Sequence, residues 1–391
     1  MSIIKGRFDG PKDVVAGVKD FKEKRGIKGI ILVVVIMALI LAGIFFFLNR
    51  GYSGYKVLDR YSSGANASVK FASYGTNILR YSNDGISSLN DKFESNWTQG
   101  YNMQKPLVDV CGEYVVCGDY HGEEIYIFNN KGLVTKISVT YMLEDLKVSA
   151  KGGVFAVLAD KERKYMKYYD KNGDTIAEGL VQLKKTGYPL SFDISEDGRL
   201  LAMSYLYISS GILKSSIVFY NFDKAGESEI DRIVASYEYS DAVIPQVSFY
   251  GNDMAVAVGD SAAYFFEGSE KPTLKKTMDF DHEAESVFVD GDKLGVVWAN
   301  PGSDKPYHAE IYKSNGTRIG NFDLDTVYDS YAFSGENILA YNDNDCKLYS
   351  MSGAVKFNYT FENRIFGMTP VNGKERFVLV TSDEAQVIAL K

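Results

Sequence analysis

The feature that most constrains the fold is a unit of about 40 residues that recurs from residue 68 to the end of the chain. Each unit contains four short runs of alternating apolar and aromatic residues, separated by turns rich in Gly, Asn and Asp. Such runs predict β-strands, and helical periodicity is almost absent from this part of the chain. Four strands in a repeat of this length are typical of one blade of a β-propeller.

Two turns recur within the units. The first joins the innermost strand to the second, and it reads SEDG from Ser195 to Gly198, before the apolar run RLLAMSY. The second joins the third strand to the fourth and often contains Asn-Gly, as at Gly173 and Gly316. Asn and Gly tolerate the positive φ angles of a type I′ turn, so we predict type I′ hairpins at these positions.

Eight units can be counted, and the last one is incomplete. They span residues 68–104, 106–141, 144–185, 189–240, 243–281, 283–325, 327–363 and 364–391. The last unit lacks a fourth strand, which residues 55–62 can supply. Pairing these two segments would close the ring and remove the exposed strand edges of an open one. The sequence therefore predicts an all-β fold, an eight-bladed β-propeller over residues 55–391, with seven blades as the alternative.

An apolar segment precedes the repeats. Residues 29–48 read GIILVVVIMALILAGIFFFL and carry no charge. A helix of about 20 apolar residues is long enough to cross a bilayer core of about 30 Å. A cleaved signal peptide has a shorter apolar stretch, about 7 to 15 residues, that ends in small residues, whereas Phe45, Phe46 and Phe47 stand at the end of this one. We therefore predict one uncleaved transmembrane helix.

The distribution of charge predicts the orientation of this helix. Residues 1–28 carry 8 basic and 4 acidic side chains, which by the positive-inside rule indicates a cytoplasmic basic tail. Residues 49–54 would form a stalk, and the propeller would lie on the extracellular side of the cell membrane. Beyond the tail the chain has 35 basic and 47 acidic residues, a net charge of −12. Such an acidic domain lacks the basic footprint that nucleic-acid binding requires.

Three cysteines, Cys111, Cys117 and Cys346, could form at most one disulfide. An exported protein of this size that depended on disulfides would carry more of them. Cys111 and Cys117 flank a tight turn that would place their side chains on opposite faces, or diagonally about 7 Å apart, which is too far for a bond. We predict that all three are small buried residues.

The SEDG turn before an apolar strand resembles turns of bacterial propellers of the WD40-like and quinoprotein-like types. Trp97 and Trp298 are followed by Thr98 and Ala299, so the Trp-Asp signature of WD40 repeats is missing. The quinoprotein pattern is missing too, and no quinone cofactor is implied. As a whole, an anchor followed by a propeller of weak repeats is similar to a family of Gram-positive single-pass membrane proteins known only as a domain of unknown function. This resemblance implies a place at the cell envelope more than an activity.

Blade topology sorts the connections onto two opposite faces. Turns between the first and second strands and between the third and fourth strands share one face, which we call the tight-turn face. Connections between the second and third strands and between blades share the other, the loop face. Because residues 55–62 are a fourth strand, the stalk would join the tight-turn face. We therefore expect the loop face to point away from the membrane.

Most of the propeller's net negative charge is predicted to lie on the loop face, with few basic residues beside it. The acidic residues concerned are Asp119, Glu123, Glu124, Glu144, Asp145, Asp160, Asp241, Asp260, Asp281, Glu283, Glu285, Asp304, Asp325, Asp343, Asp345, Asp383 and Glu384. Charge summed over one face steers cationic partners. The alternative is that acidic residues simply populate polar loops. Long connections at residues 206–214 and 300–308 also fall on this face, where binding residues usually gather.

Ten binding residues are predicted on the loop face: Asp119, His121, Tyr188, Tyr207, Asp281, His282, Glu283, Glu285, Tyr307 and His308. Tyrosine suits protein interfaces and stacking on sugar rings, although strand packing also favours it. Histidine beside carboxylates can bind metal, but no two of these histidines have the spacing of a zinc site, so no metal site is predicted. Weak calcium binding near Asp343 and Asp345 is the only cofactor expected, because the glycine and the distant glutamate of a calcium loop are missing.

No sequence motif of catalysis is present, since the chain lacks a Gly-x-Ser-x-Gly elbow, a P-loop and an HExxH helix. We therefore expect a non-catalytic binding or scaffold module at the cell envelope, which offers its acidic face to a partner protein or a cell-wall polymer. A surface glycan hydrolase or lyase with a carboxylate pair in the central funnel is one alternative. An envelope sensor that signals through the single helix is another.

Overall fold

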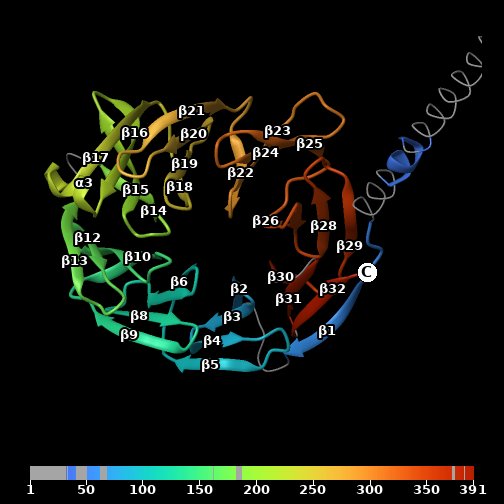
Figure 1. The fold of residues 1–391 in the computed structure, drawn as a ribbon, viewed down its shortest axis with the longest axis horizontal. Helices are drawn as coiled ribbons and strands as arrows, with labels where there is room; N and C mark the ends of the chain where they lie inside the picture. The colour runs from blue at the N-terminus through green and yellow to red at the C-terminus, as the bar shows by residue number, and fades with distance from the viewer. Residues whose placement is uncertain are drawn as a thin grey trace, which may run out of the picture. The chain divides into compact units, whose positions relative to one another are not determined.

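The computed structural model describes residues 32, 34–40, 51–61, 68–161, 163–181, 187–371, 375–382 and 384–391. The chain divides into two compact units, Met1–Gly51 and Tyr52–Lys391. The second unit is a ring of eight four-stranded antiparallel sheets (Figure 1), and each sheet is one blade. The prediction of an all-β propeller with eight blades is confirmed, and the seven-bladed alternative is wrong.

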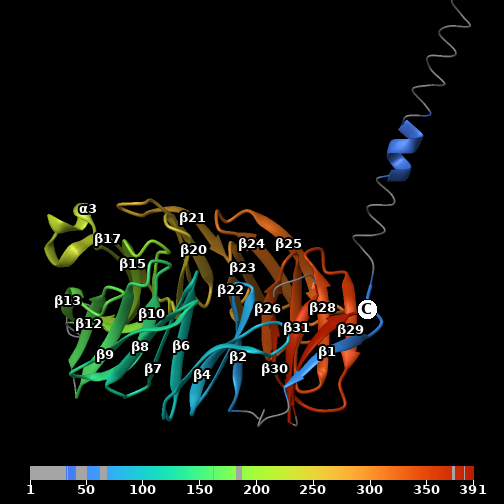
Figure 2. The same ribbon diagram turned by 60° about the horizontal axis from the view of Figure 1, so that its bottom comes forward.

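In every blade the four strands lie side by side from the ring axis outward, and Figure 2 shows them running between the two faces of the ring. From the innermost strand outward, blades 1 to 4 are β2 (Lys70–Tyr74), β3 (Asn77–Ser82), β4 (Gly85–Leu89), β5 (Ser95–Gly100); β6 (Pro106–Cys111), β7 (Tyr114–Asp119), β8 (Glu124–Asn129), β9 (Gly132–Ser138); β10 (Met142–Val148), β11 (Val154–Asp160), β12 (Arg163–Tyr169), β13 (Thr175–Val181); and β14 (Tyr188–Ile194), β15 (Leu200–Ser209), β16 (Ile212–Asn221), β17 (Ile233–Ser240). In the same order, blades 5 to 8 are β18 (Gln246–Tyr250), β19 (Met254–Val258), β20 (Ala262–Glu267), β21 (Thr273–Asp279); β22 (Ala284–Asp290), β23 (Lys293–Ala299), β24 (Tyr307–Lys313), β25 (Arg318–Leu324); β26 (Ser330–Ser334), β27 (Asn337–Tyr341), β28 (Asp345–Ser350), β29 (Val355–Thr360); and β30 (Ile365–Pro370), β31 (Arg376–Thr381), β32 (Ala385–Leu390), β1 (Tyr55–Tyr61). Blade 4 also carries a short helix α3 (Lys224–Glu227) and a 3₁₀ turn η1 (Ile230–Arg232) between β16 and β17.

The predicted spanning segment 29–48 is described only in part. Leu32 and residues 34–40 are helical, and the rest of the segment lies outside the described residues. Within the described residues, no helix has both the length and the apolar character needed to cross a membrane.

Strand burial follows position within the blade. Second strands face a neighbouring blade on both sides, so β11 is buried at five consecutive positions, from Val154 to Leu158. Outermost strands face solvent on one side, and β17 accordingly alternates between covered and exposed residues. The apolar core therefore lies between the blades. Across the first seam, for example, the rings of Trp97 and Phe128 stack with centroids 5.0 Å apart.

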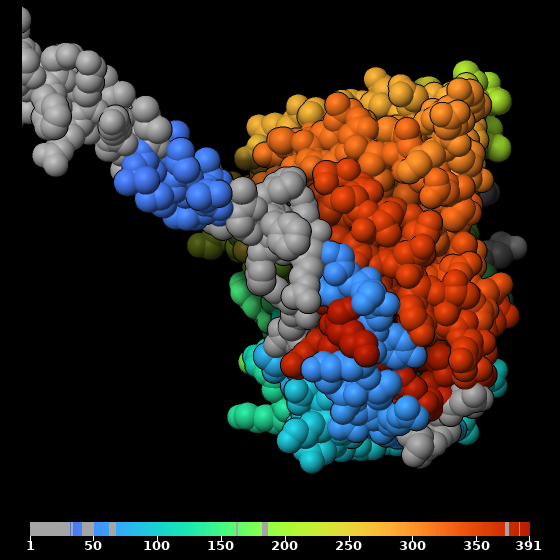
Figure 3. Space-filling model, turned by 90° about the vertical axis from the view of Figure 1, so that its right-hand side faces the viewer, coloured from blue at the N-terminus to red at the C-terminus, as the bar shows by residue number. Residues whose placement is uncertain are grey.

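The ring is closed by its own N-terminal strand. β1 pairs antiparallel with β32, with Tyr55 opposite Leu390 and Tyr61 opposite Ala385. Figure 3 shows this strand, in blue, packed among the red residues of the last blades. The Tyr55 ring lies 5.3 Å from the Phe361 ring of blade 7, and the Tyr61 ring lies 5.7 Å from the Phe93 ring of blade 1. The closing strand predicted at residues 55–62 is thus present over Tyr55–Tyr61, and residue 62 lies outside the described residues.

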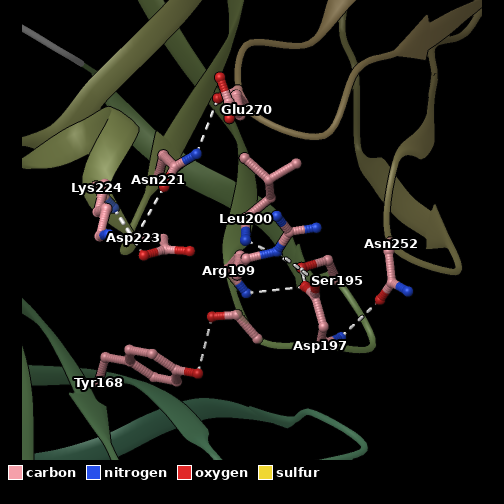
Figure 4. A network of polar contacts seen from close by, with 11 residues as sticks. Tyr168, Ser195, Asp197, Arg199, Leu200, Asn221, Asp223, Lys224, Asn252 and Glu270 are labelled. Atoms are coloured by element: carbon pink, nitrogen blue, oxygen red, sulfur yellow. Dashed lines mark hydrogen bonds and ion pairs between the residues drawn. The ribbon is translucent and has the colours of Figure 1, made fainter.

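The SEDG turn ties three blades together on the tight-turn face (Figure 4). The Ser195 hydroxyl donates to the Asp197 carboxylate at 2.9 Å. The Asp197 backbone N–H donates to the Asn252 side-chain oxygen in blade 5 at 2.9 Å. From blade 3, the Tyr168 hydroxyl donates to the Gly198 carbonyl at 2.9 Å. These bonds satisfy backbone groups of a turn that the blade itself leaves unpaired.

The turns between third and fourth strands differ from the prediction of type I′ hairpins. Gly173 has φ 91°, but Asn172 is not among the residues with positive φ, whereas a type I′ turn needs two such residues. The Gly173 N–H donates to the Asp170 carbonyl at 3.0 Å, and the Asp170 carboxylate accepts the Asn172 N–H at 2.8 Å. The side chain of Asp170 thus stabilises an ordinary turn, which a left-handed glycine then ends.

Two further predictions can be compared with the structure. Residues 206–214 do not form a long loop, because β15 and β16, strands of ten residues each, extend through them as one hairpin. All three cysteines are free, as predicted, and Cys117 and Cys346 are buried, while Cys111 is half-buried. Burial raises the pKa of the Cys117 thiol to about 12, so this thiol stays protonated and unreactive at neutral pH.

Ring closure can be tested by truncation. A chain that begins at residue 68 lacks β1 and exposes the edge of β32, whereas a chain that begins at residue 51 retains it. We expect the shorter chain to unfold at a temperature lower by about 5 °C or more and to self-associate, because an unpaired edge strand recruits other strands. Thermal circular dichroism and light scattering measure both effects. Equal unfolding temperatures for the two chains would contradict a closing role for β1.

Candidate functional site

The structure divides the ten predicted binding residues into two groups on the loop face. Those of blades 2 to 4 are Asp119, His121, Tyr188 and Tyr207, and those of blade 6 and its connection to blade 5 are Asp281, His282, Glu283, Glu285, Tyr307 and His308. Within the first group Tyr188 lines a pocket, and within the second Asp281, His282, Glu283 and Glu285 are exposed.

One member of the first group, Tyr188, lines a pocket of about 220 Å³ on the loop face, together with residues that include Tyr120, Glu144 and Lys164. The Lys164 side chain forms an ion pair with Glu144. Its Nζ lies 4.4 Å from the centroid of the Tyr188 ring and 3.2 Å from the Tyr188 hydroxyl. Although burial opposes the charged form, the hydrogen bonds with Glu144 and Tyr188 raise the pKa of Lys164. The tyrosine itself is 52 % exposed, so part of its surface is open to a ligand.

Asp119 and His121 stand on either side of Tyr120 and have structural partners. The Asp119 carboxylate accepts the backbone N–H of Gln104 at 3.0 Å and of Lys105 at 2.7 Å. The His121 ring stacks on Tyr120 with centroids 3.9 Å apart. Asp119 therefore holds the connection between blades 1 and 2, and Tyr120 supplies the surface that lines the pocket. The sequence prediction named both neighbours of this tyrosine and missed the tyrosine itself.

Tyr207 reaches the same region from blade 4. Tyr188 and Leu206 are directly opposite each other in the pairing of β14 with β15. Next to them, a Cβ atom added to Gly187 would come within 2.9 Å of the Tyr207 Cβ. Tyr188 and Tyr207 therefore lie on neighbouring strands at the loop face, which the linear sequence could not show.

In the second group, Asp281, His282 and Glu283 form the exposed connection between blades 5 and 6, and Glu285 follows at an irregularity in β22. In the described part of the chain, none of these three carboxylates takes part in an ion pair. They differ in this from Asp343, another loop-face acid, whose carboxylate lies 2.8 Å from the guanidinium of Arg364.

His308 lies within β24 and not in a loop. Its Nδ1 is 2.6 Å from an Asp323 carboxylate oxygen, and its ring lies 5.3 Å from that of Trp298. Tyr307, the residue before it, is half-buried at the start of the same strand. His308 is thus half-buried and held by partners within blade 6, whereas His282 is exposed.

No cluster of His, Cys, Asp and Glu suited to a metal ion occurs among the described residues. In the Asn-Asp segment where weak calcium binding was expected, Asp343 pairs with Arg364, and the Asp345 carboxylate accepts the Thr360 hydroxyl at 2.6 Å. Both carboxylates therefore already have a partner within the protein.

The central channel has a different character. On its tight-turn side a cavity of about 560 Å³ is lined by residues of β2, β22, β26 and β30, including Phe71, Phe288, Tyr331 and Phe333. Among the described residues of this lining, Asp290 is the one acid. A lining of this kind offers no pair of carboxylates for glycoside hydrolysis.

A charged group that sequence reasoning missed lies on the inner strands of blades 2 to 4. Lys147 of β10 lies 3.3 Å from the Asp109 carboxylate of β6, and it also interacts electrostatically with Asp193 of β14. Each carboxylate accepts a backbone N–H from the next blade, Asp109 from Val148 and Asp193 from Phe249, both at 2.8 Å. Neither carboxylate lines the channel cavity. These acids link neighbouring inner strands, which explains their burial without invoking catalysis.

The sequence can now be compared with known families. Residues 48–390 match a family described as a family of unknown function, DUF5711. The chain belongs to the DUF5711 family. A comparison with curated proteins finds no match.

Solved structures resemble this DUF5711 chain in fold. BamB from Moraxella catarrhalis is 11% identical with a TM-score of 0.51, covering 86% of this chain and 100% of that chain. The computationally designed protein Ika8 is 12% identical with a TM-score of 0.53, covering 88% and 100%. Sqt1 from Saccharomyces cerevisiae is 10% identical with a TM-score of 0.57, covering 86% and 99%. These likenesses bear out the WD40-like propeller fold expected for this DUF5711 chain and say nothing of its activity.

The inner-strand acids of this DUF5711 propeller predict a pH dependence of stability. Burial raises the pKa of Asp193 to about 6, above the value of about 3.9 in an unfolded chain. The folded state therefore binds this proton more tightly, so the stabilisation is present below about pH 4 and is lost as the pH rises through 6. Asp193→Asn keeps the acceptor for the Phe249 N–H. It should reduce the change in unfolding free energy between pH 4 and 6 by about 2 kcal/mol.

Denaturant titrations at several pH values measure this change, and Asp174→Asn, at an exposed turn, serves as the matched control. A pH profile that is the same for Asp193→Asn and for the unsubstituted chain would show that Asp193 does not titrate in this range.

Proposed function

We propose that this DUF5711 chain is a membrane-anchored, extracytoplasmic binding module at the cell envelope. The propeller presents its loop face to a partner that carries basic groups, either an envelope protein or a cell-wall polymer. No cofactor takes part, and binding rather than catalysis is the activity of this face.

The anchor in this proposal rests on the sequence of the first unit. Residues 29–48 carry no charged side chain, and the eight basic residues of the preceding segment favour a cytoplasmic N-terminus. The family match begins at residue 48, the last residue of this segment. With the N-terminus inside, the propeller stands on the extracellular side.

The observation that carries the binding proposal is the contrast between two sets of acids. Asp109 and Asp193, on the inner strands, each accept a neighbouring backbone N–H and lie close to Lys147. Asp281, Glu283 and Glu285, on the loop face, are exposed and form no ion pair with the described residues. Since exposed like charges on one face repel each other, a cationic partner would relieve the repulsion that these acids create.

The pocket of blades 2 to 4 gives the same face a second contact. Tyr120 and Tyr188 offer flat apolar area beside the ion pair of Glu144 and Lys164. Tyrosine is enriched at the centres of protein interfaces. We therefore place the specific contact at this pocket and the electrostatic attraction at blades 5 and 6.

The binding proposal is tested by charge reversal. The unit Tyr52–Lys391 is immobilised and used to capture material from detergent-solubilised envelope, alongside the triple variant Asp281→Lys, Glu283→Lys and Glu285→Lys. We expect one partner to be retained by the unsubstituted protein and its retention to fall about tenfold or more in the variant, because attraction becomes repulsion. Mass spectrometry and sugar analysis identify the retained material.

The matched control reverses three exposed acids away from this site, by Asp174→Lys, Glu227→Lys and Asp253→Lys, with the same change of net charge. Equal loss in both variants would mean that net charge alone decides retention. Equal retention of the same material by all three proteins would contradict the role of the loop face.

The anchor makes a separate prediction. The full chain should stay with membranes during extraction at alkaline pH, whereas a chain that begins at residue 51 should be released, because an apolar helix of about 20 residues partitions stably into lipid. Immunoblots of the pellet and the supernatant measure the outcome. Release of the full chain would show that residues 29–48 do not span the bilayer.

A further inference from the structure

A second pocket, separate from the loop-face site, lies in the seam between blades 3 and 4. Its volume is about 360 Å³, and its wall includes Phe155, Met166, Tyr205, Tyr220 and Phe222. Pockets that hold small organic ligands have volumes of about 300 to 1,000 Å³ and are lined mainly by apolar and aromatic side chains. Size and lining therefore both suit a small organic molecule.

The pocket exists because β13 lacks large side chains where it meets blade 4. Ala177 and Gly179 line the pocket from this strand. Outermost strands of other blades place large residues in the corresponding seams, namely Trp97, Ile137, Tyr237, Phe322 and Tyr359. A Cβ atom added to Gly179 would lie 3.5 Å from the Met166 side chain, an ordinary contact, so the strand could carry a larger residue without a clash.

An insertion found in blade 4 forms one side of the pocket. Where blade 6 has the short turn of residues 314–317, blade 4 has residues 222–232 with α3 and η1. Figure 4 shows how this insertion is fixed: the Asn221 side chain donates to the Glu270 carbonyl of blade 5 at 2.9 Å, and the Asp223 carboxylate accepts the Lys224 N–H at 2.8 Å. A fixed insertion gives the pocket a preformed edge, which lowers the entropy cost of binding.

Arg232, at the end of the insertion, lines the pocket and has an unmet hydrogen-bonding requirement. Its Nη1 is buried and has no hydrogen-bond partner among the described residues. Asp231 and Arg232 also have left-handed backbones, with φ of 55° and 61°, which residues other than glycine rarely adopt. Strained backbone and unpaired buried donors are both features of ligand sites.

The acidic residues of the lining limit what can bind. Glu178 lies 3.2 Å from Lys167, so its charge is balanced. Glu229 and Asp231 also line the pocket, and both are exposed. Together they disfavour a ligand with several negative charges, while the unpaired guanidinium nitrogen of Arg232 favours a single acceptor group.

We propose that the seam between blades 3 and 4 is a binding site for a small organic monoanion with an apolar, preferably aromatic, body. The body packs against Phe155, Met166 and Phe222, and the anionic group accepts hydrogen bonds from Arg232. This site is independent of the loop face and lies on a different part of the ring.

A pair of fluorescent probes tests the site in the full chain held in detergent-free nanodiscs. Anilinonaphthalene sulfonate carries an aromatic body and one negative charge, and N-phenylnaphthylamine has nearly the same body without the charge. We expect saturable binding of one sulfonate probe per chain, about tenfold tighter than that of the neutral probe, because only the charged probe pairs with the guanidinium. Fluorescence titration, with empty nanodiscs as background, measures both affinities.

Three variants connect the binding to the pocket. Gly179→Leu fills the cavity and should weaken both probes about tenfold or more, and Ala177→Val is a second filling variant in case the first does not fold. Arg232→Gln should weaken the sulfonate probe about tenfold and leave the neutral probe within about twofold. Arg364→Gln, at an exposed arginine directly before blade 8, is the matched control and should change neither affinity.

The proposal is overturned if the two probes bind equally well to the unsubstituted chain, or if the filling variants that fold by circular dichroism retain the binding. Loss in Arg364→Gln equal to that in Arg232→Gln would likewise overturn it, since binding would then follow net charge and not the pocket.

Discussion

The structure depends on one strand pairing, that of β1 with β32, which joins the two ends of the propeller chain. A ring of blades packed side by side has two free edges until its ends meet, and free edges are sites of aggregation. Because the pairing joins residues from both ends of the unit, blades 1 and 8 each keep one uncovered side until the ring closes. Tyr55 and Tyr61 then contact blades 7 and 1, so a single strand closes the apolar seams on either side of it.

In the closed ring the apolar core lies in the seams between blades, and residues from two neighbouring sheets pack in each seam. Most seams use a large residue from the outermost strand, such as the Trp97 ring stacked on Phe128. The seam between blades 3 and 4 is the exception, since Ala177 and Gly179 leave space there. Because the other seams show how the fold ordinarily packs, the missing large side chain between blades 3 and 4 identifies that seam as a candidate ligand site.

Two acidic residues, Asp119 and Asp281, illustrate how hydrogen-bond partners and exposure distinguish a structural residue from a candidate binding residue. Asp119 and Asp281 look alike in the sequence, as loop acids followed closely by a histidine. In the fold, Asp119 accepts two backbone N–H groups from the preceding connection, while Asp281 stays exposed without an ion pair in the described residues. The first is part of the scaffold. The second is free to meet a partner, and the proposed binding face rests on residues of that second kind.

The eight blades, the closing strand and the two faces could all be predicted from the order of the residues, because strand alternation and turn residues are local signals that a repeat multiplies. The same reasoning placed Tyr188 and the acids at residues 281–285 on one face, since blade topology fixes which connections share a side. Other features exist only in three dimensions. Asp109, Lys147 and Asp193 come from three blades, and their grouping follows from a distance in space that no spacing in the chain encodes. The pocket at Gly179 likewise arises because β13 has small residues where it faces blade 4. A small residue indicates a pocket only when the structure shows which surface it faces.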